Sequence, residues 1–188
     1  MRGICRSDTT RSKWLPYWSE DAAGGFVING SVFERDIRNK VGSVDVIVAL
    51  TGLFHERNPL GTLRRLAYLT NDYLLLYSTV VAPFDRTIGS ERVRFAATSM
   101  WPATGLSLAK MAALEAYWRE RGVQLAQFER LRSGLPNDIA LEQGGWWWFF
   151  GEQAIEKLLE RAGLEVVETA AQWEMRGRSY LARKKRRT

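Results

Sequence analysis

Residues 44–81 read VDVIVALTGLFHERNPLGTLRRLAYLTNDYLLLYSTVV, and this stretch decides the fold. Residues 44–50 form an almost unbroken apolar run, which predicts a strand in the middle of a parallel sheet, buried on both faces. Asn58 and Pro59 then supply an N-cap and a proline at the first helical position. A second apolar run over residues 73–81 completes a β-α-β unit, for which we predict parallel strands and a right-handed crossover.

The first strand of this unit indicates where chemistry belongs. In parallel sheets, ligands bind beyond the carboxyl ends of the strands, which points to residues 50–55. His55 is the only histidine of the chain, and an imidazole suits the removal of a proton from a hydroxyl or an amine. A capping or packing role for His55, alongside Glu56, is the alternative.

The composition predicts one globular domain. Of 188 residues, 46% are apolar and 12% aromatic, which is enough for a hydrophobic core. The net charge is +6, but residues 183–187 are all Lys or Arg, so the body of the chain is nearly neutral. The single cysteine, Cys5, permits no internal disulfide and no cysteine-based metal site, and we predict no metal. Because no apolar run approaches the roughly 20 residues of a membrane span, we expect a soluble, cytoplasmic protein without membrane contact.

The connection after residue 81 is far longer than the roughly two to six residues that usually join elements of α/β proteins. Within it, residues 107–121 show helical periodicity, and residues 125–131 suggest a second short helix. We therefore predict a helical insertion over residues 83–145 that covers the carboxyl ends of the strands. The alternative is that this segment has no role at the strand ends and only enlarges the hydrophobic core.

The densest aromatic segment of the chain, GGWWWFF, follows at residues 144–150. Three consecutive indoles cannot all face one core, so at least one of Trp146, Trp147 and Trp148 is expected to be exposed or to cover a ligand. Stacking on a base or a sugar would give these residues a substrate-binding role. Apolar packing beneath the last helix is the equal alternative.

One helix and two strands end the chain. Residues 152–162 carry an apolar stripe at helical spacing, and Gly163 provides a left-handed cap. Residues 164–170 and 178–182 read as two strands joined by a turn, which makes the last strand antiparallel to its neighbour.

The order and spacing of these elements resemble the carboxyl-terminal half of a class I S-adenosylmethionine-dependent methyltransferase. The segments that carry the resemblance are DVIVALTGLFH at 45–55, NPL at 58–60, EQAIEKLLERAGLEVVE at 152–168 and GRSYLARK at 177–184. The resemblance implies an α/β fold with an incomplete Rossmann-like sheet, mostly parallel with a reversed last strand, plus the helical insertion. It also implies S-adenosylmethionine as the cofactor and methyl transfer to an oxygen or nitrogen atom. The chain looks most similar to wobble-uridine tRNA carboxymethyl transferases and to methyltransferases of glycans and small molecules, so the acceptor is expected among these classes.

The resemblance also assigns cofactor-binding roles. Asp36 matches an acid that accepts a hydrogen bond from the adenine amine, and Ile37 follows it with a backbone contact to the ring. The alternative is that Asp36 is a solvated loop acid paired with Arg35 or Arg38. Three further residues lie where the strand end faces the cofactor, and an ordinary strand-to-loop turn is the alternative for them: Leu50, Thr51 and Gly52.

One family feature is missing from the sequence. Class I enzymes hold the cofactor with a glycine-rich turn after the first strand, and no G-x-G occurs anywhere in this chain. We therefore expect residues 1–40 to be an unassigned remnant of the amino-terminal half, residues 41–183 a methyltransferase-like domain, and residues 184–188 a basic tail. A truncated gene, a decayed non-enzymatic relative and a partner chain that completes the sheet all explain the missing motif.

Two functions follow as alternatives. The first is a methyltransferase that, as it stands, binds its cofactor weakly or not at all. The second is a non-enzymatic remnant or partner subunit that binds protein or RNA. Because an unfinished sheet exposes unpaired backbone groups, we expect a homo-oligomer or a partner chain at its open edge.

Overall fold

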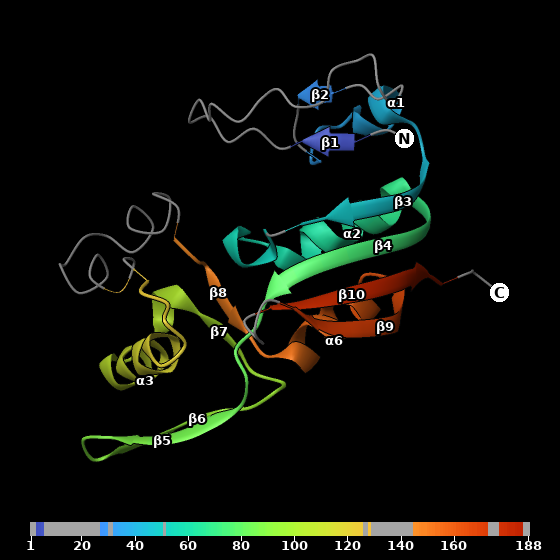
Figure 1. Cartoon of the computed structure of the whole chain (residues 1–188). Helices are drawn as coiled ribbons and strands as arrows, with labels where there is room; N and C mark the ends of the chain where they lie inside the picture. Colours follow the sequence, from blue (N-terminus) through green and yellow to red (C-terminus); the bar gives the residue numbers. More distant parts are fainter. Residues whose placement is uncertain are drawn as a thin grey trace.

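The structure is a computed structural model that describes residues 3–5, 27–29, 32–50, 52–125, 128, 145–172 and 177–185. Along the chain (Figure 1), its elements are β1 (Gly3–Cys5), β2 (Val27–Asn29), α1 (Ile37–Val41), β3 (Val44–Ala49), η1 (Leu53–His55), α2 (Pro59–Leu69), β4 (Thr70–Thr79), β5 (Phe84–Ile88), β6 (Glu91–Phe95), β7 (Met100–Pro102), η2 (Ala103–Gly105), α3 (Leu108–Arg119), β8 (Trp148–Phe150), α6 (Glu152–Arg161), β9 (Leu164–Gln172) and β10 (Gly177–Lys184).

The main sheet has four strands in the order β3-β4-β10-β9. Strands β3 and β4 pair in parallel, as predicted for the β-α-β unit. Strand β10 lies between β4 and β9 and runs antiparallel to both, which confirms the reversed last strand. This four-stranded sheet is nevertheless mixed rather than mostly parallel, because β3 with β4 is its one parallel pairing among the described residues. A separate two-stranded parallel sheet joins β1 and β2.

The prediction that β3 lies inside the sheet and is buried on both faces is wrong for the described residues. Strand β3 is at the margin of the four-stranded sheet. Its Ile47 side chain packs against the core, whereas Val46 and Val48 on the opposite face are 46% and 52% exposed. Helices α2 and α6 lie together on one side of the sheet, and no described helix lies in front of the other side in Figure 1.

The two helices of the covered face begin and end where their sequences predict. The side chain of Asn58 accepts a hydrogen bond from the Gly61 amide at 2.9 Å, and Pro59 opens α2. Helix α6 is followed by Gly163, whose φ of 87° is the left-handed cap conformation that favours glycine. The core beneath these helices includes several fully buried side chains from both helices and the sheet: Leu63, Leu74, Ile155, Leu159, Leu164, Tyr180 and Ala182.

The amino-terminal end of α6 is held by the insertion. The carbonyl oxygen of Ala97 accepts hydrogen bonds from the amides of Gln153 and Ala154, and the Ser99 carbonyl accepts one from Gly151. The Ala97 backbone passes so close to Gly151 that a Cβ there would lie 2.2 Å from its oxygen. Helix α6 therefore has a backbone carbonyl where a capping side chain usually sits.

The insertion is not only helical. Helix α3 forms within the predicted range, and the Ser107 side chain caps it by accepting from the Lys110 amide. Residues 84–95, however, form the antiparallel hairpin β5–β6, with Gly89 at φ 61° in its turn, and β7 pairs with β8. In β6, the buried Val93 and Phe95 alternate with the exposed Arg92 and Arg94, and this short alternation is the signal that helical reasoning passed over. The second predicted helix, over residues 125–131, falls largely outside the described residues.

A second, aromatic core fills the insertion. Tyr117 and Trp118 of α3 are 1% exposed and pack with Phe95 of β6 and Phe149 of β8. The Tyr117 hydroxyl also accepts a hydrogen bond from the Ala82 amide at 2.8 Å, just after β4. The insertion is thus attached to the end of the sheet at which β4 finishes.

Candidate functional site

The candidate site lies where β3 ends. Leu50 is 67% exposed, and Gly52 is followed by the short helix η1. A Cβ built on Gly52 would meet nothing within 4 Å, so the space beside this loop is open. Within η1, Leu53 and Phe54 are buried and His55 is exposed. Thr51 lies outside the described residues.

His55 and the tryptophan segment come together at this end of the sheet. The Nδ1 atom of His55 lies 2.9 Å from the carbonyl oxygen of Gly145, ninety residues away in the sequence. The amide of Trp147 donates a hydrogen bond to the Phe54 carbonyl at 2.7 Å. The predicted catalytic residue and the predicted substrate-binding residues are therefore parts of one cluster.

Electrostatics at His55 follow from its partner. A carbonyl oxygen can only accept a hydrogen bond, so the Nδ1 atom of His55 carries the hydrogen. In the neutral ring, the lone pair is then at Nε2. The His55 residue is exposed at the end of β3, so a ligand there can approach its ring.

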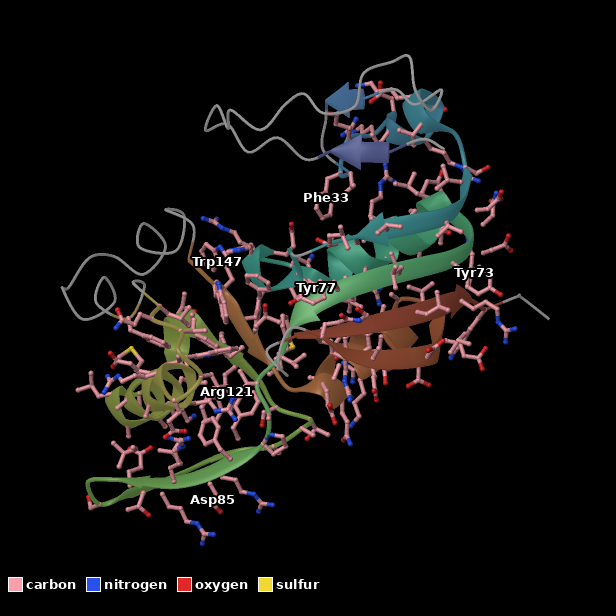
Figure 2. The ribbon with its side chains drawn as sticks, viewed as in Figure 1. Phe33, Tyr73, Tyr77, Asp85, Arg121 and Trp147 are labelled. Carbon is pink, nitrogen blue, oxygen red and sulfur yellow. The ribbon has the colours of Figure 1, made fainter. Side chains whose placement is uncertain are left out.

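The three tryptophans divide between two cores, and each is half-buried. Trp146 packs on Phe54, with ring centroids 4.7 Å apart, and lies perpendicular to Trp118 at 5.2 Å. Trp148 packs against the core beneath α6, which is the arrangement of the packing alternative. Trp147, labelled in Figure 2, has the guanidinium of Arg57 over its ring at 4.6 Å.

Sequence reasoning missed two parts of this cluster. Arg57 is exposed two residues after His55 and stacks on Trp147, and no motif points to it. The Gly145 carbonyl orients His55, and a backbone carbonyl leaves no signature in the sequence. The adjacency of Arg57 and His55 in the chain is the one available hint for the arginine.

The structure does not bring Asp36 and Ile37 to this site. They lie at the start of helix α1, which joins the amino end of β3, whereas Gly52 follows its carboxyl end (Figure 1). The Ile37 side chain is fully buried against Val41 and Leu69. The exposed Asp36 carboxylate lies 3.4 Å from the Lys40 ammonium, which resembles the solvated-loop alternative. A strand of this length separates its ends by roughly 20 Å, so the cofactor roles of both residues stay predictions.

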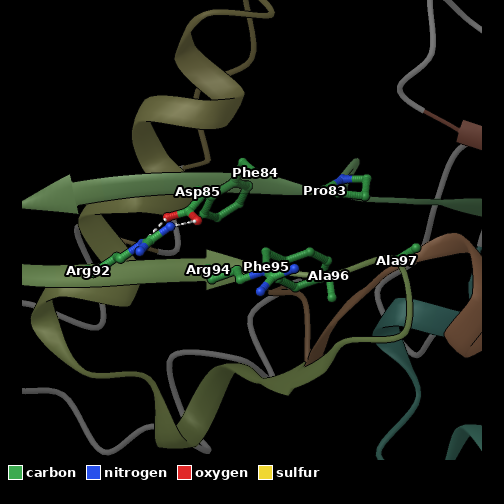
Figure 3. Close-up of a pocket in the computed structure, with 8 residues that line it drawn as sticks. All are labelled: Pro83, Phe84, Asp85, Arg92, Arg94, Phe95, Ala96 and Ala97. Atoms are coloured by element: carbon green, nitrogen blue, oxygen red, sulfur yellow. Dashed lines mark hydrogen bonds and ion pairs between the residues drawn. The ribbon is translucent and has the colours of Figure 1, made fainter.

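Two surface cavities in the described part of the chain lie elsewhere. One, of about 550 Å³, lies along the β5–β6 hairpin (Figure 3). Within it, the Arg92 guanidinium hydrogen-bonds Asp85 and holds the pKa of that carboxyl below its usual value. The other, of about 450 Å³, lies between α6 and β9. Neither is lined by a predicted site residue.

Among the residues that the structure describes, no three His, Cys, Asp or Glu side chains gather as metal ligands would. None of the described helices has both the length and the apolar character that crossing a bilayer requires.

Residues 11–169 match the family model described as a methyltransferase domain. The chain belongs to the methyltransferase-domain family. This match, which extends over most of the chain, confirms the resemblance, which covers roughly residues 36–184. No curated protein sequence matches the chain significantly.

Solved structures similar to this methyltransferase-domain chain include three with low identity. Magnesium protoporphyrin IX methyltransferase from Synechocystis PCC 6803, with bound SAH, is 14% identical over 86% of this chain and 52% of its own, with a TM-score of 0.42. Mitomycin 7-O-methyltransferase MmcR is 15% identical over 86% and 34%, with a TM-score of 0.46. The glycopeptide N-methyltransferase MtfA, complexed with S-adenosyl-L-homocysteine, is 9% identical over 86% and 61%, with a TM-score of 0.45. The chain thus spans less than two thirds of the length of each.

Proposed function

We propose that this chain takes part in the transfer of a methyl group from S-adenosylmethionine to an oxygen or nitrogen atom of a small-molecule or glycan acceptor. Membership of the methyltransferase-domain family supports the reaction class. The site we propose is the end of β3, with Leu50, Thr51 and Gly52 on the cofactor side. His55 and the tryptophan segment form the acceptor side.

The observation that carries the proposal is the contact between His55 and Gly145. Because the Gly145 carbonyl fixes the hydrogen on Nδ1, the neutral imidazole presents its lone pair at Nε2 as a general base. A hydroxyl or amine acceptor that donates a hydrogen bond to Nε2 would lose its proton to that nitrogen, and the cofactor would give up the methyl group from its sulfonium sulfur and leave as S-adenosylhomocysteine. The buried neighbours Phe54 and Leu53 hold the ring in place, since η1 packs into the core.

The described residues fit one side of a cofactor. The open space beside Gly52 allows a nucleoside to approach the backbone, and the exposed Leu50 side chain offers an apolar surface. The cofactor, when bound, supplies the methyl group. Asp36 would belong to the same pocket only if α1 lay at the other end of β3, so the proposed site does not include it.

The acceptor side favours a ligand with a flat ring. The half-buried Trp147 indole packs partly against the aromatic core, and Arg57 lies over its ring, so a flat ligand ring would take the place of the Arg57 guanidinium. Ring stacking on such an indole contributes roughly 1–3 kcal/mol. A nucleobase of tRNA would satisfy the same contact, so small aromatic acceptors, glycans and tRNA are the classes to compare.

Calorimetric titration with S-adenosylhomocysteine tests the cofactor side. We expect heat of binding, and we expect Gly52→Leu to weaken the affinity at least about tenfold, because the new side chain fills the open space. The matched control is Gly105→Leu, which makes the same change at an exposed glycine of η2, where a Cβ meets only the Pro102 ring at 3.7 Å. No heat at millimolar cofactor would contradict the proposal.

The acceptor side is tested at His55. We expect His55→Gln to lower the turnover of methyl transfer by about 10²–10⁴-fold, since the general base is lost. The heat of S-adenosylhomocysteine binding should stay unchanged. The measurement is transfer of a labelled methyl group to phenol, amine, glycan and tRNA acceptors. Equal turnover of the wild type and His55→Gln would rule out the catalytic role.

A second candidate function is that of a non-enzymatic partner subunit. The observation that favours it is the position of β3 at the sheet margin, with Val46 and Val48 half exposed. Binding of protein or RNA without any cofactor heat would support this candidate over the enzyme.

A further inference from the structure

One face of the main sheet, which we call the open face, carries a continuous apolar surface. It consists of the outward side chains opposite α2 and α6: Val46, Val48, Tyr73, Leu75, Tyr77 and Leu181. Figure 2 labels Tyr73 and Tyr77 along β4. Because side chains alternate along a strand, Leu74 and Leu76 enter the covered core while Leu75 lies on the open face.

The strand register places the apolar residues of the open face in cross-strand rows. Val48 is paired with Leu75, and Leu75 is paired with Leu181 on β10. In the next row, Val46 is paired with Tyr73, and Tyr73 with Arg183. The centre of the face is therefore apolar from β3 across to β10.

Charge on the open face lies at its rim, toward β9. The Arg183 guanidinium is 2.9 Å from the Glu165 carboxylate of β9. Glu168, on the same outer strand, is paired with Leu181. An apolar centre with a polar rim is the arrangement of a protein interface. The rim carries both signs of charge, so an identical surface can approach it without one-signed repulsion.

Tyr77 adds an aromatic side chain to the open face. Its ring lies over Gly177, where a Cβ would be 2.3 Å from the phenol oxygen. Burial raises the pKa of the Tyr77 phenol even though no described helix covers this face. The end of the Tyr77 ring therefore packs against β10 at Gly177.

We propose that the open face binds a second copy of this chain, sheet against sheet. The four strands have 6 to 10 residues each and lie about 4.8 Å apart, which gives a face of roughly 500 Å², or roughly 1,000 Å² for two copies. That area is at the lower limit of a specific interface. A two-fold axis would place the apolar centre against itself, as an isologous dimer requires, with the strands of the two sheets within about 30° of each other.

This proposal does not depend on methyl transfer, so it is tested by oligomeric state alone. Sedimentation equilibrium of the full chain across a wide concentration range should show a monomer–dimer equilibrium. Val48→Lys and Leu181→Lys each place a charge in the apolar centre and should weaken dimerisation at least about tenfold. Leu108→Lys is the matched control, because Leu108 is 73% exposed on α3 and lies off the open face.

Each outcome decides the proposal. Dimers that dissociate in both open-face variants and persist in Leu108→Lys support it, provided that circular dichroism shows the variants folded. A monomeric wild type overturns it. A dimer that survives Leu181→Lys but is lost in Val48→Lys also overturns it, since that result indicates pairing along the β3 edge. A Leu181→Ser variant replaces Leu181→Lys if the charged variant fails to fold.

Discussion

The two faces of the main sheet differ in how far their side chains are buried, although neighbouring residues of the same strands supply both faces. Leu74 and Leu75 are neighbours on β4, and Leu74 is fully buried beneath the helices while Leu75 on the open face is only partly buried. Both belong to the same apolar run of the sequence. The difference shows that burial is decided by what covers a strand, and that an apolar run alone does not say how many of its faces are covered.

The largest expected effect separates the two faces directly. Leu74→Ala leaves a cavity in the covered core and should lower the free energy of unfolding by about 2–5 kcal/mol. Leu75→Ala should lower it by less than about 1 kcal/mol, because its side chain is already partly solvated. Urea unfolding at low protein concentration, where the chain is monomeric, makes the measurement. Equal losses would mean that something covers the open face in the monomer.

A smaller loss of unfolding free energy is expected on substituting two glycines. Gly151 precedes α6 on the covered face, and Gly177 lies on the open face. Gly151→Ala would drive a methyl group into the Ala97 backbone and should cost about 1–3 kcal/mol of unfolding free energy. Gly177→Ala, on the open face, meets the end of the Tyr77 side chain, which can move, and should cost less. Thermal unfolding of the two variants compares a rigid neighbour with a flexible one. A larger loss for Gly177→Ala would show that Tyr77 is locked in place.

The smallest effect concerns alkaline pH. Burial raises the pKa of Tyr180, on the covered face, and to a lesser extent that of Tyr77. A raised pKa means that the folded state holds the phenol proton more firmly, so this stability is present below about pH 10 and is lost as the pH rises through the folded value. The loss of stability at alkaline pH should therefore be reduced more by Tyr180→Phe than by Tyr77→Phe. Urea midpoints between neutral and alkaline pH provide the test, and equal effects of the two variants would count against the difference between the faces.

Much of the fold could be predicted because local signals agree with tertiary packing. The β-α-β unit, the cap at Asn58 and the end of α6 at Gly163 follow from residues that act on their own neighbourhood. The hairpin β5–β6 escapes such reasoning because its alternation is short and mixed with charges. The position of β3 at the margin of the sheet could not be predicted from the sequence, because the apolar run of a strand does not indicate which strands pair with it.

The candidate site was predictable in its residue types and not in its contacts. A unique histidine after a strand and a run of tryptophans are visible in the sequence, and the structure brings His55 to within reach of that segment. The carbonyl of Gly145 and the stacking of Arg57 depend on the path of the backbone through the insertion. The position of Asp36 depends on the direction of α1, and no pattern in the sequence predicts that direction.

The carbonyl of Ala97 has a consequence for how the molecule loses its structure. Because this oxygen from the insertion receives the amides of Gln153 and Ala154, melting of the insertion would remove the cap of α6. The two cores should therefore unfold in one cooperative transition. Excising the insertion and joining its ends with a short linker should therefore destabilise the helix that covers the sheet.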